Sequence, residues 1–402
     1  MSGRLGRSVC LVVVLGVLLG ACGGVEDDAP PGTATVPPTL PTVATPSTVA
    51  APPTAASPGA VATATPAPTA TMSAEELRRL RPNELGAIPI LEYHSFTTKG
   101  SEAGPYDRTY KAFQRDLEWL YANGFYVVPL RDVVLNRIAA PAGKRPVVLT
   151  FDDSLASQFR LLPGEDGHHR IDPKTAVGVM EAFYRAHPDF GRGGFFAVML
   201  VGCFDYTNPG PVVEEDQVPL CGKKIRWLVD HGYEVGNHTI THPNLSDVTD
   251  AQLREEVGGM QARVRALDAR AEADILAMPF GAYPSDSGND AQMALLRDGF
   301  TYEGQEVRII ACLKVGAEPQ VSPASVAWDP IYIARIIAYD SDDYGYSRFW
   351  FARFAENPSS LYVSDGDPGT ITVPSALPPA IDGTLDEGKV ERDGLRLVRY
   401  DG

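Results

Sequence analysis

Apolar and polar residues alternate in short blocks between residues 88 and 316, and the blocks predict strands and helices in turn. Runs such as RPVVLTF (145–151) and GGFFAVMLV (193–201) are typical of buried strands. Residues 110–124 have the spacing of an amphipathic helix that ends at Gly124. Roughly seven such strand–helix units predict parallel strands with helices outside them. We therefore expect an α/β fold, namely a distorted (β/α)7-type barrel in a single domain.

The same reading assigns each block a structure. The expected strands are 88–94, 126–130, 145–151, 193–201, 233–239, 273–281 and 307–316. The expected helices are 110–124, 131–138, 174–187, 223–232, 250–267 and 291–299. Residues 325–402 have fewer helix signals and many Gly, Pro, Asp and Ser, and residues 360–373 are expected to form short strands and turns that close the domain.

The N-terminus has a different pattern. Arg4 and Arg7 precede an apolar run, 9–19, that is too short to cross a bilayer and is typical of a signal peptide over residues 1–21. The LGAC at 19–22 resembles a bacterial lipobox, which implies that Cys22 becomes a lipidated N-terminus. The alternative is a plain secreted protein with an incidental cysteine.

Residues 22–71 consist mostly of Pro, Thr, Ala and Val, which predicts a lipid-anchored, disordered stalk. The folded domain is expected over 72–402. Together these features predict an exported protein held at the outer face of the cell membrane through its lipid.

The net charge limits the classes of molecule that the protein can bind, and the cysteines indicate the redox state of its compartment. The net charge of −16 excludes nucleic acid as a partner, because phosphate binding needs a basic face. No protein partner is predicted. Cys203 and Cys221 bracket a polar, proline-containing insertion, so a disulfide is expected in an oxidising compartment. Two buried thiols are the alternative.

Polar residues with catalytic potential follow several predicted strands. Asp152 and Asp153 end one strand, and His94 ends another. His238 and His242 are four residues apart, which on a helical turn would place both imidazoles on one side. With an added Asp they supply three ligands and leave positions open, as in catalytic zinc sites. The alternative is a pair of loop histidines with ordinary hydrogen bonds.

Three short segments together resemble a known family. TFDDS (150–154), HTITHPNLS beginning at His238 and MPFGAYP (278–284) look like the first three motifs of the polysaccharide deacetylases, carbohydrate esterase family 4, with the NodB homology domain. The resemblance runs from about residue 88 to at least residue 316.

The resemblance implies a role for each matched residue. Asp153, His238 and His242 would bind a divalent cation, Zn²⁺ first and Co²⁺ or Ni²⁺ as alternatives. Asp152 would be the general base, taking a proton from the attacking water. Pro279 and Phe280 would lie at the substrate, with a backbone N–H near Phe280 stabilising the oxyanion.

Two departures from the family pattern concern the base and the acid. An Arg usually lies ahead of the third motif, where this chain has Ala277 and Met278. No histidine follows His242, so the usual general acid is missing.

A branch similar to the poly-N-acetylglucosamine deacetylases of biofilms has the acid's motif at the N-terminus, as a strand ending in YH. IPILEYHSF (88–96) matches that pattern. His94 is then the expected acid, across the cation from Asp152, and a structural histidine is the alternative. Arg335 and the acids of 340–343 are candidates for positioning the site, although a solvated acidic loop is as good an interpretation.

The implied activity is that of a metal-dependent hydrolase of non-peptide C–N bonds, an N-deacetylase that removes acetyl groups from N-acetylated amino-sugar polymers at the cell surface. A catalytically impaired carbohydrate-binding protein on the same fold is the main alternative, supported by the missing Arg. A hydrolase of non-carbohydrate amides is the third. The sequence leaves the polymer open.

Overall fold

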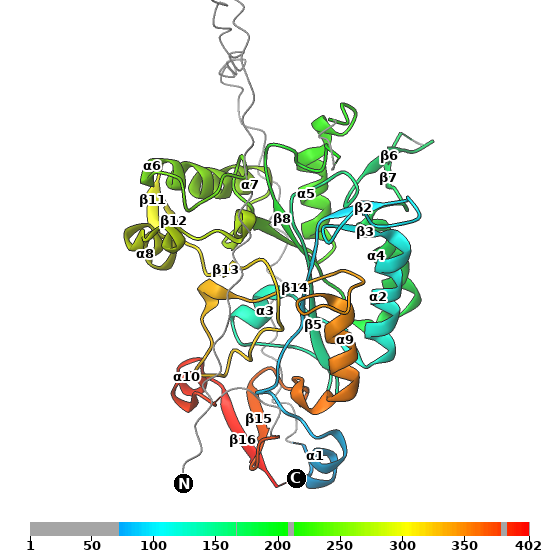
Figure 1. Cartoon of the computed structure of the whole chain (residues 1–402), viewed down its shortest axis with the longest axis vertical. Coiled ribbons are helices and arrows are strands. Elements are labelled where there is room, and N and C mark those ends of the chain that lie inside the picture. The colour runs from blue at the N-terminus through cyan, green and yellow to red at the C-terminus, as the bar shows by residue number, and fades with distance from the viewer. Residues whose placement is uncertain (1–71, 166, 208–212, 379–383, 402) are drawn as a thin grey trace, which may run out of the picture. The chain divides into compact units, whose positions relative to one another are not determined.

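A curled, parallel eight-stranded sheet forms the centre of the protein (Figure 1). The computed structural model describes residues 72–165, 167–207, 213–378 and 384–401, so the expected signal peptide, Cys22 and the stalk lie outside the described residues. The strand order is β13-β10-β9-β8-β5-β1-β14, with β4 beside β5. The strands are β1 (Ile90–Tyr93), β4 (Phe125–Val127), β5 (Arg145–Phe151), β8 (Phe195–Val198), β9 (Glu234–Asn237), β10 (Ile275–Ala277), β13 (Ala311–Leu313) and β14 (Ile336–Ile337).

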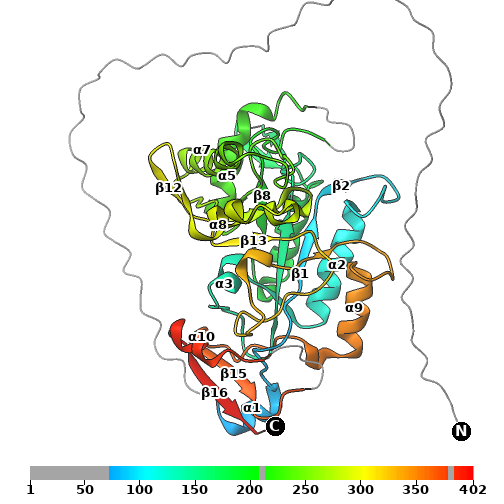
Figure 2. The same cartoon turned by 60° about the vertical axis from the view of Figure 1, so that its left-hand side comes forward.

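Helices follow most strands, as the sequence predicts, and pack outside the sheet (Figure 2). They are α2 (Tyr110–Ala122), α3 (Leu130–Val134), α4 (Ala176–Ala186), α5 (Cys221–Asp230), α6 (Asp250–Leu253), α7 (Met260–Leu267), α8 (Asp290–Asp298) and α9 (Ser347–Glu356). Among the described residues, no helix has both the length and the apolar character needed to cross a membrane.

Alternate residues of each strand point to opposite sides of the sheet, and this places the polar residues of interest. Leu91 and Leu149 face outward and pack in one apolar cluster with α2 and α4, whereas Ile90 and Val148 belong to a second cluster within the barrel. Because the side-chain period of a strand is two, Glu92 and Thr150 continue the inward rows. Both side chains are buried.

The segment between Ile333 and Ile337 joins the two edges of the sheet. Ile333 forms a parallel bridge with Leu313 of β13, and β14 pairs in parallel with β1. One distorted strand therefore closes the barrel, which confirms the expected distorted (β/α)7-type architecture. Gly316 permits the close approach, since a Cβ there would lie 2.0 Å from the Arg335 carbonyl oxygen.

The C-terminal part differs from expectation. Besides strands and turns it contains α9 and a second short helix, α10 (Glu387–Arg392). Strands β15 (Thr370–Pro374) and β16 (Arg396–Tyr400) pair in parallel below the barrel, near the N-terminal helix α1 (Ala74–Leu80) (Figure 1). They share a small apolar cluster with Leu85. The helix signals are weaker here because the apolar positions of α9 are aromatic and closely followed by turn residues.

Candidate active site

The expected site residues meet at the carboxyl ends of β1, β5 and β9. Asp152 follows β5 two residues after inward-facing Thr150, and His94 follows β1 two residues after Glu92. His238 follows β9 directly. Asp152 and His238 are each 1% exposed, so the two side chains lie deep in the mouth of the barrel.

Asp153 lies between the two histidines. Its Oδ1 is 3.3 Å from Nε2 of His238 and 3.6 Å from Nε2 of His242. Ligands at 2.0–2.1 Å from a tetrahedral zinc ion lie about 3.3 Å apart, so these separations suit one shared cation.

The protonation of His238 also fits a metal ligand. Its Nδ1 lies 2.8 Å from the Ala277 carbonyl oxygen, which can only accept, so Nδ1 carries the hydrogen. Nε2 is buried and has no hydrogen-bond partner among the described residues. Burial lowers the pKa of His238, but Asp153 and Asp152 outweigh this effect and raise it, so a cation that binds the Nε2 lone pair displaces a proton. Burial, followed by the charge of His238, lowers the pKa of His242 to about 4, which keeps its imidazole neutral and able to bind a cation.

The two histidines stand on a loop, which corrects the expected helical turn. Thr239 and His242 have positive φ values of 65° and 60°. The His242 N–H donates to Thr239 Oγ1 (3.0 Å), and the carboxylate of Glu256 accepts the N–H groups of Ile240 and Thr241. Side chains thus satisfy backbone donors that a helix would pair with its own carbonyls. Glu256 itself lies on a π-helical turn, Arg254–Gly259, in the expected helix 250–267.

A buried arginine holds the proposed base. Nη1 and Nη2 of Arg335 donate to the two carboxylate oxygens of Asp152, each over 2.8 Å, and Nε donates to the Lys314 carbonyl oxygen. Burial opposes ionisation of Asp152, but the positive charge of Arg335 outweighs it and holds the pKa of this carboxyl well below its usual range. Asp152 is therefore ionised at neutral pH, and the same positive charge lowers its affinity for a proton.

Arg335 thereby resolves the first departure from the family pattern. Ala277 and Met278, where an arginine is usual, are buried apolar residues. The guanidinium comes instead from the segment that closes the barrel. Sequence reasoning named Arg335 as one of several candidates, but could not pair it with Asp152.

His94 lies beside the proposed base. Its Nε2 is 4.0 Å from Asp152 Oδ2 and 3.7 Å from Glu92 Oε1, and its ring meets the Tyr106 ring edge-on. The expected placement across the cation from Asp152 is therefore wrong, because the inward rows of neighbouring β1 and β5 bring the two side chains together.

Glu92 is a site residue that sequence reasoning missed. Its Oε2 accepts the Gly316 N–H (2.9 Å) and lies 3.4 Å from Nε of Arg335. Burial raises the pKa of Glu92, and the charge of Arg335 offsets part of the effect. The available signal was an acid on the inward row of a buried strand, two residues before His94.

The other candidates lie at the rim or elsewhere. Pro279 is buried, whereas Phe280 is 66% exposed and its ring packs edge-on against His242. The oxyanion role of this pair stays a prediction. Within the acidic segment 340–343, Asp340 accepts hydrogen bonds from Arg108 and Arg115. Its carboxylate therefore pairs with arginines on the outside of the barrel and not with the site residues.

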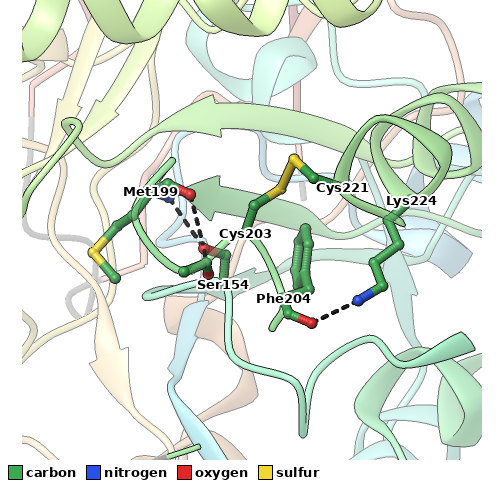
Figure 3. The surroundings of a disulfide bond; sticks show 7 residues. Ser154, Met199, Cys203, Phe204, Cys221 and Lys224 are labelled. Carbon is green, nitrogen blue, oxygen red and sulfur yellow. Dashed lines mark hydrogen bonds between the residues drawn. A yellow bond between two sulfur atoms is a disulfide. The ribbon is translucent and has the colours of Figure 1, made fainter. Parts of the chain in front are cut away.

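The disulfide expected from the sequence is present in the structure between Cys203 and Cys221 (Figure 3). It ties the loop after β8 to the start of α5. Lys224, one turn further along α5, donates from Nζ to the Phe204 carbonyl oxygen over 2.6 Å. The loop is therefore held to α5 at two consecutive residues, by the disulfide at Cys203 and by the hydrogen bond at Phe204.

This loop also contacts the loop that carries the proposed base. Ser154, next to Asp153, donates from Oγ to the Gly202 carbonyl and accepts the Met199 N–H (Figure 3). The Phe204 N–H donates to the Ser154 carbonyl oxygen over 2.6 Å. The disulfide therefore supports the backbone next to a proposed cation ligand.

The first prediction concerns the buried ion pair. Arg335→Met should lower the free energy of unfolding by about 3–5 kcal/mol, because it leaves the Asp152 carboxylate buried without its partner. Urea unfolding measures the change. The matched control is Arg348→Met, which breaks an exposed pair with Asp342 and should cost less than about 1 kcal/mol. Equal losses in the two variants would contradict this account.

Comparisons with known proteins agree with the motifs. Residues 211–297 match the polysaccharide deacetylase family model. The putative polysaccharide deacetylase YxkH of Bacillus subtilis is 22% identical over 54% of this chain and 64% of its own length. A chitooligosaccharide deacetylase of Bradyrhizobium is 36% identical over 15% of this chain and 28% of its own length. This chain therefore spans less than two thirds of either relative.

Solved structures were also similar to the chain. The Streptococcus pyogenes deacetylase PplD, in complex with acetate, is 17% identical, with a TM-score of 0.44 and coverage of 62% of this chain and 91% of its own. A de-N-acetylase from Aggregatibacter actinomycetemcomitans is 14% identical, with a TM-score of 0.45 and coverage of 66% and 99%. The family match contains both histidines of the cation set and confirms the resemblance to polysaccharide deacetylases seen in the motifs.

Proposed function

We propose that the protein is a metal-dependent hydrolase that removes acetyl groups from N-acetylated amino-sugar polymers. One observation carries the proposal: Asp153, His238 and His242 converge as a cation set beside Asp152, a buried carboxylate gripped by Arg335. A divalent cation bound there would supply a Lewis acid that acidifies water and polarises the acetyl carbonyl. The family match supports a polysaccharide as the substrate.

Asp152 would act as the general base. Arg335 occupies one lone pair on each of its oxygens, so the remaining lone pairs can accept a proton from the water that attacks the acetyl carbon. The guanidinium fixes the carboxylate's plane. The hydrogen bond from His238 Nδ1 to the Ala277 carbonyl oxygen would hold the imidazole with its Nε2 directed at the cation.

His94 would act as the general acid. Hydrolysis breaks the amide C–N bond, and the amine leaves readily only when its nitrogen is protonated. His94 is the one histidine besides the cation set in the described mouth of the barrel, and its Nε2 lies 4.0 Å from Asp152. Both proton transfers can then occur on one side of the substrate, with Glu92 beside the ring to orient it.

The structure weakens the main alternative, a catalytically impaired binding protein. That interpretation depended on the missing arginine of the third motif. Arg335 forms an ion pair with Asp152 that can replace the interaction of that arginine. No specific observation favours a second function.

The test of the proposal is acetate release from a panel of N-acetylated glycans. We expect release by the zinc- or cobalt-loaded protein, loss of release after a chelator, and recovery on adding metal. His242→Ala removes one of three ligands and should lower both metal content and rate. A metal-loaded protein that binds glycans but releases no acetate would establish the binding-protein alternative instead.

The role of His94 gives a separate prediction. His94→Gln should lower turnover by about 10²–10⁴, the range of general acid catalysis, with metal content unchanged by elemental analysis. His169→Gln, on the exposed strand β7 (His169–Ile171), is the control and should keep normal turnover. Near-normal turnover of His94→Gln would assign the acid to another group.

We also propose that the protein is exported and lipid-anchored, on the basis of residues 1–71. Cys22→Ser should then leave the protein without lipid and move it from the membrane to the soluble fraction on cell fractionation. Unchanged membrane attachment of that variant would rule out this anchor.

A further inference from the structure

A polar groove of about 470 Å³ is lined in part by the ribbon formed by β2 (Ser95–Thr97) and β3 (Asp107–Thr109). We call it the basic groove. Its lining includes four cationic side chains, those of Lys99, Lys111, Arg115 and Lys174, among several hydroxyl groups. Only two acids, Glu102 and Asp340, belong to the described lining.

The two acids do not neutralise the lysines. Glu102 binds Arg108 over 2.9 Å, and Asp340 binds Arg108 over 3.1 Å and Arg115 over 3.0 Å. Lys99, Lys111 and Lys174 are exposed, and none of them takes part in an ion pair within the described residues. Three ammonium groups without an ion-pair partner among the described residues therefore line one groove of a chain whose net charge is −16.

The residues that line the basic groove adjoin those of the proposed active site along the chain and through hydrogen bonds. Strand β2 begins at the residue after His94, and Thr97 at its end lines the groove. Ser157, on the loop that carries Asp152, accepts the Phe96 N–H at its Oγ, and its carbonyl accepts the Tyr110 hydroxyl. We therefore expect a polymer that lies across the proposed base and acid to extend toward the groove.

We propose that the basic groove binds an anionic group, a carboxylate or a phosphate, carried by the glycan next to the sugar that is deacetylated. This inference rests on the proposed function and narrows its substrate class. Ammonium and hydroxyl donors match the oxygens of either anion and the hydroxyls of the sugar. Because the chain as a whole is acidic, a local group of lysines guides an anionic chain to one side of the site.

The same charges act against the product. Each hydrolysis converts a neutral acetamido group into an amine that is protonated near neutral pH, so a processed stretch of polymer becomes cationic. The groove therefore repels stretches that are already deacetylated and favours those still acetylated. The enzyme consequently discriminates between substrate and product away from the reacting bond.

The test compares two triple variants with equal net charge. In the groove variant, Lys99, Lys111 and Lys174 are replaced by Gln. In the control, Arg78, Arg79 and Arg185 are replaced by Gln; all three are exposed, the first two on α1 at the far end of the barrel and the third at the far end of α4 (Figure 1). Asp152→Asn, added to both and to the parent, prevents turnover while binding is measured.

Four probes of matched length are used at low and moderate salt: a carboxylated, a phosphorylated and a neutral N-acetylated glycan, and the deacetylated form of the neutral one. We expect the parent to bind an anionic probe best and the deacetylated probe worst. The groove variant should lose roughly tenfold in affinity for the anionic probe at low salt, with less loss at moderate salt. Its affinity for the neutral probe, and every affinity of the control, should stay within about twofold.

The two anionic probes distinguish carboxylate from phosphate as the ligand. Equal binding of anionic and neutral probes by the parent would overturn the proposal, as would equal losses in the groove variant and the control. Acetate release by the protein with Asp152 intact is measured separately. Absence of release from every glycan, with anion selectivity preserved, would defeat the proposed function and leave the groove assignment standing.

Discussion

The ion pair between Arg335 and Asp152 joins the closure of the barrel to the assembly of the site. Arg335 lies between Ile333, which pairs with β13, and Ile336, which pairs with β1. Its guanidinium can reach Asp152 only when this segment fills the gap between the two edge strands. The pair is fully buried, so the cost of removing both charges from water must be offset by good geometry, and two hydrogen bonds of 2.8 Å provide it.

The same pair explains how two adjacent carboxylates coexist at the end of β5. Asp152 and Asp153 point to different partners. Asp152 is compensated by Arg335, whereas Asp153 faces His238 and His242 and has a positive φ of 74°. The turn of the backbone at Asp153 separates the two charges. One carboxylate can therefore accept a proton while the other binds a cation.

The sequence predicted most of the fold because the strand and helix signals are local. Residues 145–151 and 110–124 read correctly from periodicity alone, and the two histidines and two aspartates were found from their place after strands. Arg335 could not be assigned, since its role depends on a contact across 183 residues of sequence. Glu92 could not be recognised for a related reason. An acid within a strand can be identified as a site residue only when it is known which side of the strand faces the inside of the barrel.

The loop from Asp152 to Ser157 is attached to several neighbouring elements, and these attachments allow it to hold an unfavourable backbone conformation. Asp153 and Ser154 both have positive φ, which costs of the order of 1–3 kcal/mol at each non-glycine residue. Arg335 holds one end and the disulfide-braced loop holds Ser154. Ser157 binds the backbone of β2 and Tyr110 beside the basic groove. Because the conformation is fixed from the barrel, from α5 and from the β2–β3 ribbon at once, the base and the cation ligand keep their separate directions without a ligand to order them.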